Sequence, residues 1–420
     1  MNKQLKKTIN WLYTNYMFFK RRAFPYKPLA VFGPEHEFSV INEELKPLPI
    51  VDQIIKDFCG KIVDFVYTPR FTFGKEASLQ IMEIKAKTPF KSAEMFEETM
   101  QNAVSTLWIF LEERYQARLL GTGMHPLLNL EHTQIWPHSN RDIIEELGKI
   151  FNLKRHGWLN IQSFQLNLPY SNEKKAVSLY NALTHLCAYL PAISASSPIY
   201  EGKLGLNVDN RLHHYKMKKR EIPSMSGDVV PEYISSFNQF RKNVIGKYSE
   251  DLRNVGAGPK LLYSERDNLR SLIFRFNREA IEIKIMDEQE CIKSDVALSC
   301  FIRAATRGLL AEQTESPSHQ LLVNDYTSIV ENGLRARVAH PSGETARGVC
   351  QHFFRLASQY AKKDEKKYLW IVKKRIEEGN LSELIRERVL AKAQKTSFKE
   401  AIVSTYLKLS ECLSRNQPYF

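Results

Sequence analysis

The sequence predicts an α+β fold in which one sheet carries the polar residues and a helical part follows it. Two observations carry this prediction. Between about residues 30 and 310, short runs of alternating polar and apolar residues are separated by amphipathic segments, and after residue 310 the strand signals fade. The composition is that of a globular protein, since 43% of the 420 residues are hydrophobic and 25% are charged.

Three amphipathic segments of the mixed region are predicted to be helices. They are residues 92–113, 140–151 and 171–190, and Pro191 ends the third. A basic aromatic helix is also expected over residues 4–22, and we interpret it as a docking helix rather than a membrane or RNA contact.

In the C-terminal part, helix ends are marked by glycine and by capping boxes. Gly379 indicates a helix stop, and two pairs have the spacing that opens a new helix, Asn380 with Glu383 and Ser397 with Glu400. The chain is therefore divided into a basic N-terminal helix (1–28), a mixed domain (29–310) and a helical subdomain (311–420).

The strands are the informative part of the sequence. In VFGPEHEFSV (31–40), QIMEIKAKTP (80–89), QSFQLNLP (162–169) and AIEIKIMDE (280–288), polar residues recur at every second position. A half-buried strand places such residues on one face. With the segment just before the fourth strand, the polar set is Glu35, Glu37, Glu83, Lys85, Ser163, Gln165, Asn167, Arg275, Asn277, Glu282 and Lys284.

The residue types of this face point to chemistry. A solvent-exposed sheet face would also alternate, but glutamates on separate strands repel one another unless cations lie between them. Carboxylates are ligands that Mg²⁺ prefers, usually together with substrate phosphates, and neighbouring Lys and Arg can neutralise phosphate or carboxylate groups. The residues alone therefore predict an enzyme that uses a nucleotide, Mg²⁺ and an acidic co-substrate. Neither a P-loop nor a Rossmann fingerprint occurs.

Composition excludes several other classes. Six cysteines are scattered without a CxxC pair, which favours reduced thiols over a zinc site or disulfides. No apolar run reaches the roughly 20 residues of a membrane span, and no secretory signal is expected, so we expect a cytoplasmic protein. The net charge of +13 would also suit a nucleic-acid-binding protein, but the glutamates on the polar face disfavour that alternative. A homo-oligomer is left open.

Six segments in this order resemble the glutamate-cysteine ligase and carboxylate-amine ligase family: GPEHEF, QIMEIKAKTP, GTGMHP, QSFQLNLP, LPAISASSPIYEGKLGLNVDNR and AIEIKIMDEQ. The resemblance covers about residues 31 to 305 and is most specific over 190–211. It implies a glutamine-synthetase-like catalytic domain over 29–310, with a curved, mainly antiparallel sheet enclosing a polar active site. In this family ATP phosphorylates the γ-carboxylate of glutamate, and an amine attacks the acyl phosphate to give an amide.

The resemblance also implies roles for residues at matching positions. The Mg²⁺ ligands or their immediate neighbours would be Glu35, Glu37, Glu83 and Glu282. The catalytic residues would be Glu35, Glu83 and Arg211, the last holding a substrate carboxylate. The cofactor and glutamate sites would be lined by Lys284, Arg275, Gln165 and Asn167, with Lys284 facing the ATP phosphates.

Two positions depart from the family pattern. Many carboxylate-amine ligases carry a His-x-His pair where this chain has Ser163 and Gln165, and the Gln-x-Asn form resembles plant and proteobacterial glutamate-cysteine ligases. Lys284 stands where arginine is expected. These departures bear on the identity of the acceptor amine rather than on the reaction class. The resemblance implies cysteine as the acceptor and glutathione biosynthesis as the context. Another acceptor amine, or a phosphotransfer that stops at the phosphorylated product, are the alternatives.

The residues after the fourth strand are expected to serve the next helix. Asp287 would cap this helix, with the orientation of Lys284 as the alternative role. Glu288 and Glu290 would lie in the first turn, where the helix dipole favours negative charge.

Overall fold

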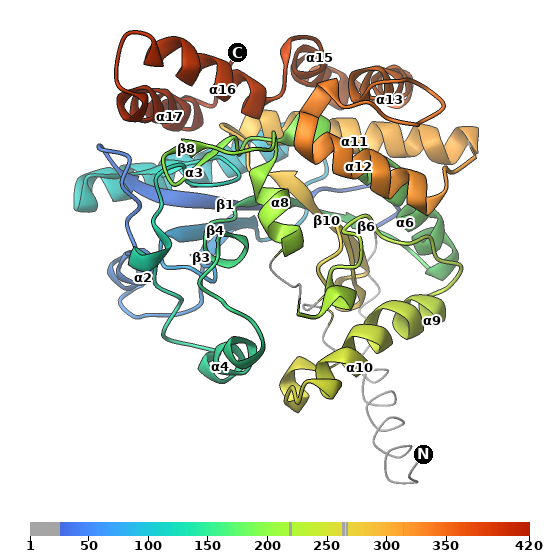
Figure 1. Ribbon diagram of the computed structural model, residues 1–420, viewed down its shortest axis with the longest axis horizontal. Coiled ribbons are helices and arrows are strands. Elements are labelled where there is room, and N and C mark those ends of the chain that lie inside the picture. The colour runs from blue at the N-terminus through green and yellow to red at the C-terminus, as the bar shows by residue number, and fades with distance from the viewer. Residues whose placement is uncertain (1–25, 218–220, 263–264, 266–267, 314) are drawn as a thin grey trace.

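The computed structural model describes residues 26–420, except 218–220, 263–264, 266–267 and 314 (Figure 1). The helix expected over residues 4–22 lies outside these residues. An eight-stranded sheet has the order β2-β3-β4-β1-β6-β10-β9, and β5 also pairs with β1. Its strands are β1 (Gly33–Asn42), β2 (Phe65–Tyr67), β3 (Phe71–Lys75), β4 (Ile81–Ala86), β5 (Ala117–Leu120), β6 (Ser163–Pro169), β9 (Leu272–Arg275) and β10 (Ala280–Asp287). A separate hairpin joins β7 (Ile199–Tyr200) to β8 (Lys203–Leu204).

Every pair of neighbouring strands in the large sheet is antiparallel. The α+β prediction with a mainly antiparallel sheet is confirmed. The four predicted strands are β1, β4, β6 and β10, because the alternation that marks them is a local property of a half-buried strand. Their apolar face is fully buried and includes Phe38, Met82, Ile84, Phe164, Leu166 and Ile283.

Long helices cover this apolar face. They are α3 (Ala93–Tyr115), α6 (Glu173–Cys187) and α11 (Ile292–Glu312), and Figure 1 shows α3 and α11 on one side of the sheet. Predicted segments 92–113 and 171–190 correspond to α3 and α6, and 140–151 corresponds to α4 (Arg141–Ile150). Helix α6 buries the apolar stripe that predicted it, from Ala176 to Cys187.

Shorter helices lie on the other side of the sheet. Figure 1 shows α4 and α10 there, opposite α11 and α13. The bounds of these and the remaining short helices are α2 (Val51–Cys59), α5 (His156–Leu159), α7 (Pro191–Ser194), α8 (Asn210–Met217), α9 (Phe237–Phe240) and α10 (Lys247–Asn254). An ion pair between Asp142 and Lys260 ties α4 to the chain ahead of β9.

After α11 the described residues form helices and no further strand. The helices are α12 (His319–Asn332), α13 (Ala346–Tyr360), α14 (Lys363–Lys366), α15 (Leu369–Glu378), α16 (Leu381–Ala393) and α17 (Phe398–Arg415). Gly379 ends α15, and both predicted capping boxes are present at the starts of α16 and α17. Because α12, α13 and α15 share one apolar cluster with the sheet, the division at residue 310 stays a prediction.

The six cysteines are free thiols, and all but Cys59 are buried. Within the described part of the chain, no helix is both long and apolar enough to cross a bilayer.

Candidate active site

The polar face of the sheet brings most of the predicted site residues together. Glu37 on β1 lies directly opposite Glu83 on β4. Glu35 lies opposite Lys85 on one side and Gln165 on the other, and Glu282 lies opposite Asn167. Six of the predicted residues therefore lie on one face of four adjacent strands.

On the β4–β1 half of this face, one lysine lies among the carboxylates. The Lys85 ammonium contacts Glu83, and it lies 3.9 Å from Glu35 Oε2. The Lys85 ammonium also lies 3.8 Å from the centre of the Phe65 ring, so one wall of its site is apolar. Arg278 Nη1 also donates to Glu35 Oε1 at 3.0 Å, so Glu35 has two cations beside it, whereas Glu83 is paired with Lys85.

Glu37 is held by hydrogen bonds from β6. Gln165 Nε2 donates to Glu37 Oε1 at 2.7 Å, and the Ser163 backbone N–H donates to Oε2 at 2.7 Å. Burial nevertheless raises the pKa of Glu37 to about 8, with a further upward contribution from the negative charge of Glu76. The positive charges of Arg211 and Lys284 act in the opposite direction.

Glu83 and Glu76 show the same behaviour. Burial, together with the charges of Glu35 and Glu76, raises the pKa of Glu83 well above its usual range. Burial also raises the pKa of Glu76, against the opposing charges of Lys75 and Lys85. Burial therefore disfavours the ionised form of these three carboxyl groups, and the nearby cations do not offset this effect.

Glu76 was missed by the sequence analysis. It directly follows β3, whose neighbour is β4. Thr72 and Gly74 lie opposite Lys85 and Glu83, so Glu76 continues their face. The spacing of two from Thr72 through Gly74 to Glu76 is the signal that could have identified it.

The β10–β9 half of the face is arranged differently. Arg275 donates to both carboxylate oxygens of Glu282, at 2.6 and 2.7 Å. Although burial acts to raise it, the pKa of Glu282 is lowered by Arg275 and by the charges of Lys284 and Arg278. Asn167 Nδ2 donates to Glu35 Oε1 at 3.0 Å, which links this half to β1.

Arg211 comes from α8 rather than from a strand of the sheet. Its side chain is 1% exposed, and its guanidinium donates to Asp287 and to the Ile285 carbonyl. The charges of Asp287 and Asp209 raise the pKa of Arg211, although burial acts to lower it. The predicted contact with a substrate carboxylate stays a prediction, and these internal hydrogen bonds weaken it.

The expected role of Asp287 as a helix cap is wrong. The N-cap of α11 is Cys291, and Asp287 instead accepts from the Ser196 backbone N–H at 2.7 Å and binds Arg211. Glu288 and Glu290 precede the helix and are fully buried, so they do not belong to its first turn. The run of acidic residues resembled the first turn of a helix, but hydrogen bonds to segments distant in the sequence hold these side chains.

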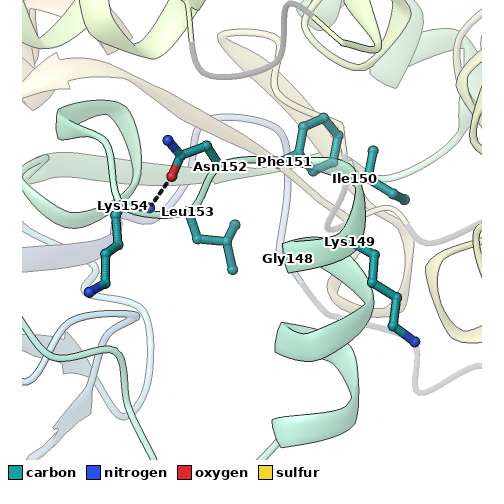
Figure 2. A pocket seen from close by; sticks show the side chains of 7 residues that line it. All are labelled: Gly148, Lys149, Ile150, Phe151, Asn152, Leu153 and Lys154. Carbon is teal, nitrogen blue, oxygen red and sulfur yellow. Dashed lines mark hydrogen bonds between the residues drawn. The ribbon is translucent and has the colours of Figure 1, made fainter.

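Two surface depressions of the described residues lie elsewhere. One, with a volume of about 460 Å³, is lined by Gly148 to Lys154 at the end of α4, where Figure 2 shows Lys149 and Lys154 extending to opposite sides. The other, of about 480 Å³, is lined by residues of α3 together with Arg70, Lys367 and Asn416. Neither depression is lined by a residue of the polar face. We place the candidate site on the sheet, because the predicted residues lie together there.

Comparison with known proteins defines the class. The sequence matches glutamate-cysteine ligase family 2 over residues 31–403, and the chain belongs to this family. It is therefore an enzyme of the carboxylate-amine ligase class.

Two relatives illustrate the range of similarity within the sequence comparisons. A protein of Archaeoglobus fulgidus, described only as uncharacterised, is 42% identical over 389 residues, which cover 93% of this chain and 100% of that protein. A protein of Legionella pneumophila (strain Paris), named "Putative glutamate--cysteine ligase 2-2", is 22% identical over 302 residues and 71% of each chain.

Two solved structures share the fold. The glutamate-cysteine ligase of Francisella tularensis in complex with AMP has a TM-score of 0.61 at 12% identity, covering 91% of this chain and 88% of that one. A bifunctional glutathione synthetase from Pasteurella multocida has a TM-score of 0.59 at 13% identity, covering 91% of this chain and 52% of that one.

Proposed function

We propose that the protein joins glutamate to an amine in an ATP- and Mg²⁺-dependent reaction, and that the amine is cysteine. The observation that carries this proposal is the uncompensated carboxylate group of Glu37, Glu76 and Glu83 on the polar face, with Lys85 and Lys284 near it. The bound AMP of the Francisella enzyme supports a nucleotide as co-substrate.

The donors on this face fit Mg²⁺. All are oxygens, from the carboxylates of Glu35, Glu37, Glu76 and Glu83 and the amides of Gln165 and Asn167, which are the donors that a hard cation prefers. Asn167 Oδ1 is buried and accepts no hydrogen bond from the described residues, so it is available to a ligand. When bound, Mg²⁺ would neutralise the carboxylates and the phosphates of ATP together.

The reaction proceeds in two displacements. An oxygen of the γ-carboxylate of glutamate attacks the γ-phosphorus of ATP, and ADP leaves. The amine nitrogen then attacks the acyl carbon, the phosphate leaves with its bridging oxygen, and the nitrogen loses a proton. We assign Lys284 to the phosphates and Gln165 to positioning Glu37, since it already donates to that carboxylate.

We assign Arg275, like Lys284, to the neighbourhood of the ATP phosphates on the β10–β9 half of the face. Because its two donors hold Glu282, it supplies positive charge next to the phosphates without leaving that partner. A cytoplasmic location, a part in glutathione biosynthesis and homo-oligomerisation stay predictions.

The test uses purified protein with ATP, Mg²⁺, glutamate and a panel of amino acids. ADP and phosphate should appear only when glutamate and an acceptor are both present, with the fastest rate for cysteine. Another amino acid giving the fastest rate would move the proposal to that acceptor.

Two controls separate the alternatives. ADP release with glutamate alone, and a hydroxamate on adding hydroxylamine, would indicate a phosphotransfer that stops at the acyl phosphate. ADP release that ignores glutamate would exclude the γ-glutamyl reaction. Salt-sensitive binding to RNA or DNA without ATP turnover would favour the nucleic-acid alternative.

A further inference from the structure

The strand that carries Glu37 has a gap in its backbone pairing. Along the edge facing β6, β1 pairs with β6 at Gly33–Glu35 and with β5 at Ser39–Asn42. Continuing the first register would place Glu37 opposite Ser163, but this pair is absent from the ladder. Glu37 therefore lies at the position along β1 where the pairing with β6 has ended and the pairing with β5 has not begun, so its N–H has no strand carbonyl to bind.

Two carboxylates replace the missing backbone hydrogen bonds. The Ser163 N–H donates to the Glu37 side chain at 2.7 Å, and the Glu37 N–H donates to Glu288 Oε2 at 2.9 Å. Glu37 is thus fixed at both ends, its carboxylate by β6 and its backbone by Glu288. A buried N–H without such an acceptor would destabilise the folded protein.

Glu288 reaches the gap because the chain after β10 is inserted beside it. Its own N–H donates to the Gln162 carbonyl at 3.2 Å. A Cβ atom at Gly121 would collide with the Gln289 carbonyl, and one at Gly123 would collide with the Asp287 carboxylate. These two glycines, which both lie in the GTGMHP segment, allow this close approach.

A second buried pair lies behind Glu288. Its Oε1 atom is 3.1 Å from His36 Nδ1, and Asp295 Oδ2 is 3.5 Å from the same nitrogen. All three side chains are 0% exposed. Asp295 makes no hydrogen bond to the β1 backbone, so among these two acids Glu288 alone joins the cluster to Glu37.

We propose that Glu288 is a positioning residue that holds Glu37 in place for binding the divalent cation. The inference rests on the proposed function, because it takes Glu37 as a ligand of that cation. Residues that orient metal ligands through hydrogen bonds commonly change metal affinity by about 10–100-fold when replaced. Glu288 would act in this way through the backbone of its ligand.

The test compares Glu288→Met, Glu288→Gln and Asp295→Asn. Each protein is titrated with Mn²⁺ as the probe, and hydrogen exchange is followed at the Glu37 amide. In Glu288→Met the Mn²⁺ Kd should rise on the order of tenfold and the Glu37 amide should exchange faster. Glu288→Gln keeps an oxygen acceptor and should rescue both. Asp295→Asn changes a buried acid of the same cluster that contacts the His36 side chain but not the β1 backbone, and should leave both near wild type.

Each remaining outcome is decisive. Wild-type Mn²⁺ affinity and exchange in Glu288→Met, or an equal loss in Asp295→Asn, would overturn the proposal. If Glu288→Met does not fold, Glu288→Asp takes its place, because it keeps the charge but is too short to reach both partners. It should then weaken Mn²⁺ binding while Glu288→Gln does not, and equal binding by the two would overturn the proposal.

These readouts do not depend on turnover. A wild-type protein that binds no Mn²⁺ would overturn the metal site of the proposed function. Unchanged exchange at Glu37 in Glu288→Met would overturn this inference alone.

Discussion

On the β10–β9 half of the polar face, Glu282 is bound through both oxygens by Arg275. On the β4–β1 half Glu83 is paired with Lys85, and Glu37 and Glu76 have positive charges nearby but no arginine that binds both of their oxygens. The pKa of Glu282 is lowered, and the pKa values of the other three are raised. Both halves bury carboxylates, so the difference comes from the cations that the chain supplies.

The comparison separates structural from functional carboxylates. A buried acid with its own arginine is neutralised in the folded protein, and removing its charge leaves the arginine unpaired. A group of acids without enough cations is self-repelling, and it is stabilised by a cation from solution. The β4–β1 half is therefore the better candidate for metal binding, and β1 and β6 separate Glu83 from Glu282 in the sheet.

The largest effect is expected for Glu83→Gln. The substitution keeps the shape of the side chain and removes a charge from the uncompensated half, so activity should fall on the order of a hundredfold. Stability without Mg²⁺ should not fall, because repulsion with Glu35 and Glu76 is relieved. Steady-state rates and urea unfolding check both parts, with Glu113→Gln on the exposed side of α3 as the control. Near-normal activity at limiting Mg²⁺ would remove Glu83 from the site.

The same chemical change at Glu282 should act on stability instead. Glu282→Gln leaves the Arg275 guanidinium with a neutral partner in a site where the acid is 1% exposed. We expect the free energy of unfolding to fall by about 2 kcal/mol, within the range for hydrogen bonds to charged groups. Urea unfolding in EDTA measures this directly. If Glu282→Gln and Glu83→Gln shift stability in the same direction, the contrast between the two halves is wrong.

Much of the fold was predictable because its signals are local. The period of two in QSFQLNLP and AIEIKIMD marks β6 and β10, and the capping boxes at Asn380 and Ser397 mark α16 and α17. Each of these signals depends on residues within a few positions of one another. Strand order and the burial of the C-terminal helices against the sheet depend on distant segments.

From periodicity, residues of the candidate site could be predicted only where they lie on strands with alternating polar and apolar residues. Glu35, Glu37, Glu83 and Glu282 belong to alternating runs, but Glu76 directly follows its strand and Gly74 interrupts the polar pattern before it. Glu288 was misassigned because its partner, the Glu37 N–H, is 251 residues away in sequence. A gap between β5 and β6 along β1 leaves no trace in any single segment.

The smallest expected effect is a pH dependence that Mg²⁺ removes. The folded pKa of Glu37 is about 8, above its usual value of 4.5, so folded Glu37 keeps a proton over a range where the unfolded chain has lost it. Its stabilising contribution is complete below about pH 4.5 and is lost as pH rises through about 8. The lowered pKa of Glu282 has the opposite consequence, since its contribution is present above about 4.5 and is lost as pH falls.

In EDTA, the free energy of unfolding should therefore drop on the order of 1 kcal/mol between about pH 6.5 and 7.5. Millimolar Mg²⁺ should flatten this slope, because a bound cation favours the ionised carboxylates. Urea unfolding across pH checks the slope, and Glu37→Gln, which has no proton to lose, should reduce it even in EDTA, while Glu76 and Glu83, whose pKa values are also raised, supply the remainder. An unchanged slope in Glu37→Gln would assign the effect to groups other than Glu37.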